Sequence, residues 1–174
     1  MTNGRVIRLA TSLIILLLVN SATGSPSQMT ITSPAFPAGG QIPAKFTCNG
    51  QSTSPELRIS GTPPGAKSLL LIADDPDAPG GVFTHWLVWN IDPQTTQWAE
   101  NSIPAGALQG TNDFSKKGYG PPCPPSGTHR YIFKIFALDR PLELKADARR
   151  ADIEDAIRGH ILAQGELIGR YTHK

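Results

Sequence analysis

The chain has 174 residues, with 16 Lys or Arg and 14 Asp or Glu, so its formal net charge is +2. Arg5 and Arg8 account for this excess, which leaves residues 25–174 with equal numbers of basic and acidic side chains. A balanced domain lacks the broad positive field that attracts polyanions. The composition therefore argues against nucleic-acid binding and against non-specific attachment to anionic membranes.

The first 24 residues have the composition of an export signal. Arg5 and Arg8 precede the uncharged stretch Leu9–Val19, and small residues follow from Ser21 to Ser25. The apolar run is about 11 residues long, whereas a membrane-spanning helix needs roughly 20, so we expect cleavage near Ser25; an uncleaved anchor is the alternative. Residues 1–24 are then a signal peptide, and residues 25–174 form one exported domain, periplasmic or secreted, without stable membrane insertion.

The rest of the chain alternates short apolar runs with Pro and Gly, which predicts a mainly β fold. The expected strands are Met29–Thr32, Lys45–Thr47, Glu56–Ser60, Ser68–Ala73, His85–Ile91 and Arg130–Leu138. In the last of these, both alternating sets of side chains are mostly apolar, which places it in the middle of a sheet covered on both sides.

One segment near the C-terminus has a helical period, with a cap expected at Asp147 or Asp152. The residues that follow this period are Ile153, Ala156, Ile157, His160 and Ile161. Leu167–Tyr171 is expected to be a further strand or an extended tail. The segment Trp98–Ser126 reads as one long irregular loop, and loops of that length in a small domain are often functional.

Cys48 and Cys123 are the two cysteines of the chain. In an exported protein such a pair can form a disulfide, but two buried free thiols fit the sequence equally well. A zinc site is disfavoured, because neither cysteine has a second Cys or a His within two to four residues.

The first group of residues suited to a site follows an apolar strand. Asp75 and Asp77 lie in the Pro-rich run 74–81, directly before His85. Proline fixes its own φ and restricts the residue before it, so stiff backbone presents these carboxylates. The alternative is a purely local role in which Asp77 caps its own turn.

The second group follows the Pro-rich run 119–127 and opens the clearest strand. His129 and Tyr131 are two residues apart, so on a strand they point to the same face, while Arg130 points to the other. An imidazole, a phenol and backbone N–H groups together are suited to hold a phosphate or a carboxylate.

Together these motifs resemble those of the phosphatidylethanolamine-binding (Raf kinase inhibitor-like) protein family. The resemblance rests on Asp-Pro-Asp-Ala-Pro at 75–79 followed by His85, and on Pro-Pro-x-Gly-x-His-Arg-Tyr at 124–131. Further matching segments, such as 46–50 and 159–163, are similar to its bacterial branch. The resemblance implies a large central antiparallel sheet packed on a smaller sheet, with a peripheral C-terminal helix.

The resemblance also implies a small pocket for anionic groups such as a phosphate or a phospholipid headgroup. Carried over by position, its ligand-binding residues are Asp75, His85, Pro125, His129 and Tyr131, and its supporting residues are Asp77 and Trp86. No cofactor and no metal are expected.

We therefore expect non-catalytic binding of a small anionic or zwitterionic ligand, with a regulatory role as its consequence. An ionised Asp75 would repel an anion, so either His85 and His129 are protonated or Asp75 accepts a bond from a cationic or hydroxyl part of the ligand. The alternatives are inhibition of a protease or kinase through a surface loop such as Trp98–Ser126 and, less favoured, hydrolysis. The sequence leaves the oligomeric state open.

Overall fold

The computed structural model describes Met1 and residues 27–173, so the expected signal peptide and its cleavage site lie outside the described residues. Among the described residues, no helix has both the length and the apolar character needed to cross a membrane. The elements are β1 (Ser27–Gln28), β2 (Thr30–Thr32), η1 (Ala44–Phe46), β3 (Leu57–Ser60), β4 (Ser68–Asp75), β5 (Phe83–Ile91), β6 (Gln97–Trp98), β7 (Leu108–Gln109), β8 (Thr128–Leu138), α1 (Arg150–Ala156) and β9 (Ile161–Thr172).

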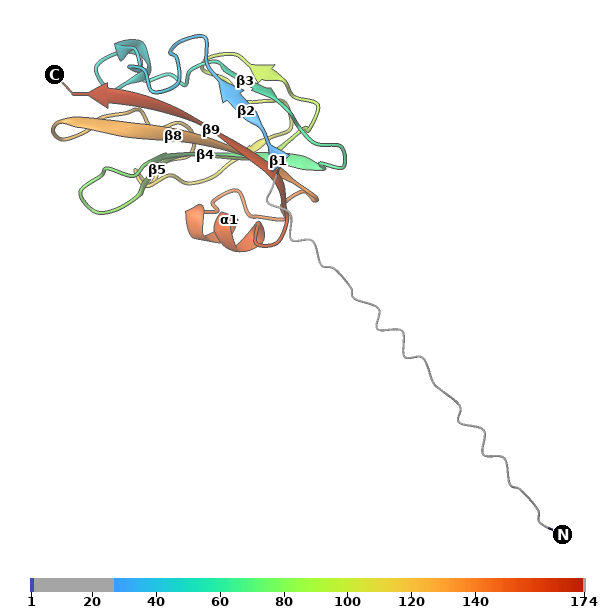
Figure 1. The fold of residues 1–174 in the computed structure, drawn as a ribbon. Helices are drawn as coiled ribbons and strands as arrows, with labels where there is room; N and C mark the ends of the chain where they lie inside the picture. Colours follow the sequence, from blue (N-terminus) through green and yellow to red (C-terminus); the bar gives the residue numbers. More distant parts are fainter. Residues whose placement is uncertain (2–26, 174) are drawn as a thin grey trace.

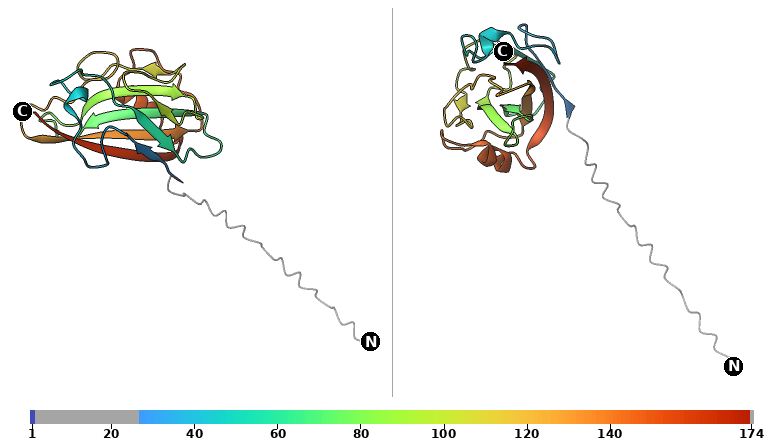
Figure 2. Two further views of the ribbon diagram at one scale, coloured as in Figure 1. Left: turned by 90° about the horizontal axis from the view of Figure 1, so that it is seen from above. Right: turned by 90° about the vertical axis from the view of Figure 1, so that its left-hand side faces the viewer.

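These elements form three layers (Figure 1). The central sheet has the order β1-β9-β8-β4-β5-β7, and a smaller sheet with the order β2-β3-β6 packs on one of its faces. Helix α1 lies against the opposite face, and the views in Figure 2 show the small sheet and the helix on opposite sides of the long strands. All pairings are antiparallel except that of β1 with β9. The expected fold class is confirmed.

The long central strands follow from continuous apolar sequence. All eight residues of β4 are buried, and β8 alternates between buried positions and positions that are exposed at Thr128 and Arg130 and half-buried further along. One apolar cluster fills the space between the two sheets and includes Trp86, Tyr131 and Phe133. A second cluster lies between the central sheet and α1 and includes Trp89 and Ile153. Both faces of the central strands are therefore covered, as the sequence predicted.

The expected strand Lys45–Thr47 is wrong. This segment is the 3-10 turn η1, in which the backbone N–H of Phe46 donates to the carbonyl of Pro43 at 3.0 Å. The Thr47 hydroxyl also donates to the carbonyl of Ala44, at 2.9 Å. These local bonds take up the groups that a strand would offer to a neighbour, which explains why a β-favouring Phe-Thr pair does not enter a sheet.

The expected helix is shorter than its apolar period. Helix α1 ends at Ala156, and Gly159 has a φ of +80°, a conformation that stops a helix, so His160 lies outside the helix and Ile161 begins β9. The residue at the N-cap is Arg149, whose backbone N–H donates to the Asp152 carboxylate at 2.8 Å. Neither expected capping residue therefore holds the cap position itself.

Two further segments can be compared with expectation. The expected strand or extended tail Leu167–Tyr171 is a strand, and it forms the second half of the twelve-residue β9. The loop 98–126 contains the short strand β7, which pairs with β5 through Val88 and Gln109. It is therefore fixed to the edge of the central sheet.

Candidate functional site

The predicted site residues come together at one end of the central sheet. The turn between β4 and β5, the start of β8 and the end of β9 all lie at this end (Figure 1). Antiparallel pairing explains this, because β4 ends at Asp75 where β5 and β8 begin. Asp75, His85, His129 and Tyr131 are all buried there.

A bulge in β5 aims His85 toward the other site residues. Ala73 pairs with Trp86 and Asp74 pairs with Thr84, so His85 is an extra residue without an opposite partner. The bulge reverses the alternation of side chains. As a result Thr84 faces α1, while His85 points toward the small sheet and packs against the Tyr131 ring at a centroid distance of 5.2 Å.

Asp75 and His129 form a buried pair. The Nδ1 atom of His129 lies 2.7 Å from Oδ2 of Asp75. The other carboxylate oxygen of Asp75 accepts the backbone N–H of Asp77 at 2.8 Å. Since a carboxylate accepts, Nδ1 of His129 carries the proton in this contact, and its Nε2 atom is left to meet a ligand.

Gly120 holds His85 from two sides. The backbone N–H of Gly120 donates to the carbonyl of His85 at 2.8 Å, and Nδ1 of His85 donates to the carbonyl of Gly120 at 2.8 Å. A Cβ atom at position 120 would lie 2.6 Å from the Phe114 ring, so this close approach needs glycine. Burial lowers the pKa of His85 below 6.5, although the Gly120 bond and the Asp75 charge oppose this shift. His85 is therefore neutral at neutral pH.

Tyr131 brings a hydroxyl to the cluster that has no hydrogen-bond partner among the described residues. Burial and then the negative charge of Asp75 raise the pKa of this phenol. It thus stays protonated. Asp75 and the backbone of Cys123 lie close enough to influence the hydroxyl, but neither meets the geometry of a hydrogen bond. A buried polar group without a partner costs free energy, which makes this O–H a donor ready for a ligand.

Sequence reasoning missed an aromatic wall beside His85. The rings of Phe83 and Phe114 lie 5.2 and 5.4 Å from the His85 ring, and 4.7 Å from each other. Phe114 is exposed at the lip of the cluster. The buried Asn112 places it, because the Asn112 amide oxygen accepts the backbone N–H of Phe114 at 3.0 Å. A polar-aromatic pair in a loop was the only signal of this role.

Asp77 does not cap its own turn. Asp75 performs that task, and the Asp77 carboxylate instead forms two bonds to the Arg130 guanidinium, at 2.9 and 2.7 Å, and accepts the Arg130 backbone N–H at 2.9 Å. These bonds lower the pKa of Asp77 to about 2, opposed by its partial desolvation. Asp77 therefore connects the β4–β5 turn to the start of β8, next to His129.

Among the described residues, two predicted site residues form neither a hydrogen bond nor a ring contact with the side chains of the cluster. The Trp86 side chain is buried in the core, where its indole N–H donates to the Gln109 side chain at 2.7 Å and its ring packs on Tyr119. Pro125 is exposed in the loop before β8. Trp86 thus contributes packing, and Pro125 contributes the stiffness of the loop that precedes His129.

The loop before β8 is also held covalently, at Cys123. Cys48 and Cys123 form a disulfide across 75 residues of sequence separation. The bridge ties the segment after η1 to the loop that leads into His129. Of the two alternatives that the sequence left open, the structure contains the disulfide and not the free thiols.

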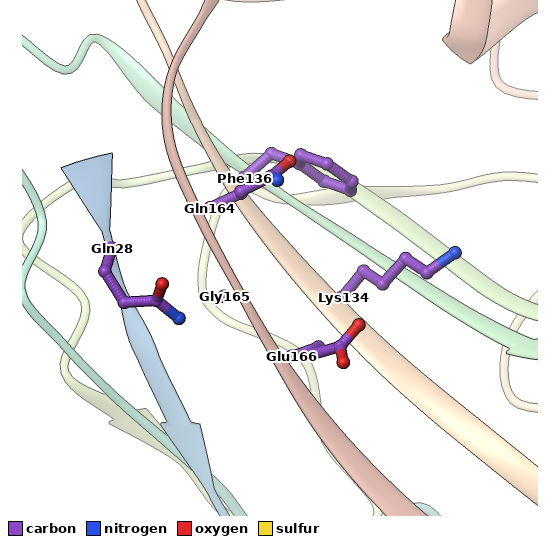
Figure 3. Close-up of a pocket in the computed structure, with 6 residues that line it drawn as sticks. All are labelled: Gln28, Lys134, Phe136, Gln164, Gly165 and Glu166. Carbon is purple, nitrogen blue, oxygen red and sulfur yellow. The ribbon is translucent and has the colours of Figure 1, made fainter. Parts of the chain in front are cut away.

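Two hollows help to locate the accessible surface. One, of about 480 Å³, borders the cluster at His129 and is also lined by Asp77, Arg130 and Arg170. The other, of about 410 Å³, lies over β8 and β9 near the opposite end and is lined by Gln28, Lys134, Phe136, Gln164, Gly165 and Glu166 (Figure 3). Lys134 is five residues along β8 from His129, about 17 Å away in a strand, so this second hollow is separate from the site.

Comparison with known proteins agrees with the motifs. A family model described as phosphatidylethanolamine-binding protein matches residues 32–172. The chain belongs to the phosphatidylethanolamine-binding protein family. A UPF0098 protein from Methanothermobacter thermautotrophicus is 47% identical over 148 residues, covering 82% of this chain and 98% of the relative. A UPF0098 protein from Aquifex aeolicus is 46% identical over 167 residues, covering 92% and 96%.

Solved structures of this family share the fold. A phosphatidylethanolamine-binding protein homologue from Chlamydia trachomatis superimposes with a TM-score of 0.81 at 40% identity, covering 85% of this chain and 99% of the other. YbcL from Escherichia coli, described as a member of the mammalian family, superimposes with a TM-score of 0.79 at 32% identity, covering 85% and 100%.

Proposed function

We propose that the cluster of Asp75, His85, His129 and Tyr131 binds a small anionic or zwitterionic ligand and does not turn it over. The observation that carries the proposal is the protonated, buried Tyr131 hydroxyl, which has no hydrogen-bond partner in the part of the chain that the structure describes. Membership of a family named for binding phosphatidylethanolamine, whose headgroup joins a phosphate to an ammonium, supports a ligand-binding role.

The negative charge of Asp75 does not prevent anion binding in this arrangement. Its two oxygens are taken up by His129 and by the backbone of Asp77. The ligand would therefore meet the Tyr131 hydroxyl, which is a donor, and the free Nε2 atom of His129.

His85 gives the site a hydrogen-bond acceptor beside its donors. Its Nδ1–H is used by Gly120, so in the neutral ring Nε2 is an acceptor. An ammonium or hydroxyl group of a ligand would suit it at neutral pH. Because burial lowers the pKa of His85, it becomes a second donor to an anion only at a pH below 6.5.

The test is calorimetric titration with phosphoethanolamine and with inorganic phosphate, at about pH 6 and about pH 8. We expect saturable binding that is weaker at the higher pH, because His85 loses its positive charge as the pH rises. His129→Ala should abolish it. The matched control is His160→Ala, since His160 also pairs with an aspartate, Asp139, at 3.0 Å, but away from the cluster. This variant should bind normally.

The outcomes separate the alternatives. Formation of a new product from phosphoethanolamine would overturn the proposal in favour of a hydrolase. No heat and no thermal stabilisation in the wild-type protein would reject the small-ligand function, and inhibition assays with proteases and kinases would follow, including variants of the loop 98–126.

Export of the chain is part of the same proposal and rests on residues 1–24 alone. The full chain expressed in a Gram-negative host should appear in the periplasmic fraction with a new N-terminus near Ser25. A chain recovered intact from the cytoplasm would contradict this. Placement in a bacterial branch of the family also stays a prediction, because close relatives come from both archaea and bacteria.

A further inference from the structure

A second cluster of reactive side chains lies beside the disulfide. The ligand atoms of Cys48, Cys123 and His173 all lie within 4.8 Å of one another. Cys48 is half-buried, whereas Cys123 and His173 are exposed. None of the three belongs to the Asp75–His129 cluster, so the inference does not depend on the proposed ligand function.

Besides the disulfide, hydrogen bonds also join the segments that carry these three residues. The backbone N–H of Cys48 donates to the carbonyl of Pro122, next to Cys123, at 3.1 Å. On the other side, the Tyr171 hydroxyl donates to the Asn49 side chain at 2.9 Å.

The end of β9 is fixed as well. Thr172 pairs with Thr128 at the start of β8, and their hydroxyl oxygens lie 2.6 Å apart. The segments that carry the three side chains are therefore anchored to one another by ordinary hydrogen bonds, and we expect their proximity to survive reduction of the bridge.

We propose that, when this disulfide is reduced, Cys48, Cys123 and His173 bind a zinc-class divalent metal ion. Two thiolates and one imidazole are a set of ligands that zinc accepts, with water in the fourth position of the tetrahedron. Two thiolates on one zinc ion lie about 3.8 Å apart, given a Zn–S distance of about 2.3 Å. Once the S–S bond is broken, the two sulfur atoms can separate to this distance.

The redox step balances with a dithiol as reductant. The dithiol gives two electrons and two protons to the Cys48–Cys123 bridge and becomes a cyclic disulfide, leaving two thiols on the protein. Metal binding then displaces the two thiol protons, and neutral His173 donates a nitrogen lone pair. The oxidised chain has no thiolates and lacks this site.

Sequence spacing alone argued against zinc, because neither cysteine has a nearby His or Cys along the chain. The third ligand comes instead from 50 residues after Cys123, brought there by the pairing of β8 with β9. This long-range convergence is invisible to a search for local ligand motifs.

The experiment titrates Co²⁺, and then Zn²⁺, into the full chain after reduction and anaerobic removal of the reductant. We expect one equivalent of Co²⁺ to give a thiolate-to-metal charge-transfer band, which Zn²⁺ then removes. His173→Ala should weaken binding by at least about tenfold, and His173→Cys should keep it with an altered spectrum. His160→Ala is the matched control and should bind like the wild type.

Three outcomes would overturn the proposal. These are equal Co²⁺ binding by the oxidised chain, a spectrum that His173→Ala leaves unchanged, and absence of the charge-transfer band from reduced protein that circular dichroism shows to be folded. Because His173 is exposed beyond the end of β9, its substitution leaves the core intact, so loss of binding in His173→Ala reports on the metal site and not on folding.

Discussion

Tyr131 carries the most specific chemistry of the candidate site at the scale of single residues. Its ring packs against His85, while its buried hydroxyl has no hydrogen-bond partner within Met1 and residues 27–173. Tyr119 is the natural comparison, because this half-buried tyrosine lies in the same region but its hydroxyl donates to the carbonyl of Phe46 at 2.9 Å. The Tyr119 hydroxyl therefore forms a structural hydrogen bond, whereas the Tyr131 hydroxyl is available to a ligand.

Substitution of these two tyrosines by phenylalanine should have opposite effects on stability. Tyr131→Phe removes an unpaired polar group and should leave the free energy of unfolding unchanged or raise it by about 1 kcal/mol, while phosphoethanolamine binds about 3- to 10-fold more weakly. Tyr119→Phe leaves a carbonyl unpaired and should lower the free energy of unfolding by about 1 kcal/mol. Urea denaturation and calorimetry measure both. A destabilising Tyr131→Phe change with normal binding would contradict this assignment.

At the scale of elements, helix α1 depends on the sheet beneath it. Seven residues are too few for a helix to be stable in isolation. Ile153 packs in the apolar cluster, and the Arg150 guanidinium pairs with the buried carboxylate of Asp74 on β4. The Thr84 hydroxyl also donates to Asp74, at 3.2 Å, and the Lys134 ammonium lies 3.6 Å from it. The helix thus provides the main countercharge of a buried acid.

Arg150→Met should destabilise the protein strongly, because it leaves the buried Asp74 charge without its nearest partner. We expect the free energy of unfolding to fall by about 3 kcal/mol. Arg158→Met is the control, since the ion pair of Arg158 with Asp155 is almost fully exposed, and its loss should cost less than about 0.5 kcal/mol. Urea denaturation of both variants checks the difference, and equal losses would show that Arg150 does not compensate Asp74.

For the whole molecule, the disulfide is the longest-range constraint. It closes a loop of 75 residues that contains β3, β4, β5, β6 and β7. Such a bridge restricts the unfolded chain, and it joins the two parts of the sequence that flank the candidate site. Stability of the site end therefore depends on segments far apart in sequence.

Removal of the bridge should lower the free energy of unfolding by about 4 kcal/mol, by the loop-entropy relation. We expect this for the Cys48→Ser/Cys123→Ser double variant, measured by urea denaturation in the presence of a metal chelator. Wild-type protein treated with a reductant and the chelator should lose a similar amount. An unchanged midpoint in both samples would show that the bridge does not restrict the unfolded chain.

The main strands were predictable because their sequence signals are strong and local. β4, β5 and β8 are long, mostly apolar runs, which is typical of strands that are covered on both faces. The 3-10 turn η1 was missed because three residues with a β-favouring composition satisfy their hydrogen bonds locally. The helix was overextended because the apolar period continues past Gly159 into β9.

The sequence by itself determined the fold class, the family and the identity of the four clustered side chains, because these depend on short motifs and on the period of apolar residues. Only the tertiary structure decided how they meet. The bulge that turns His85, the empty hydrogen-bonding position of Tyr131 and the approach of His173 to the cysteines all depend on the register between strands. Register depends on which faces of two paired strands are buried together and on the turns that join them, so one segment read alone does not fix it.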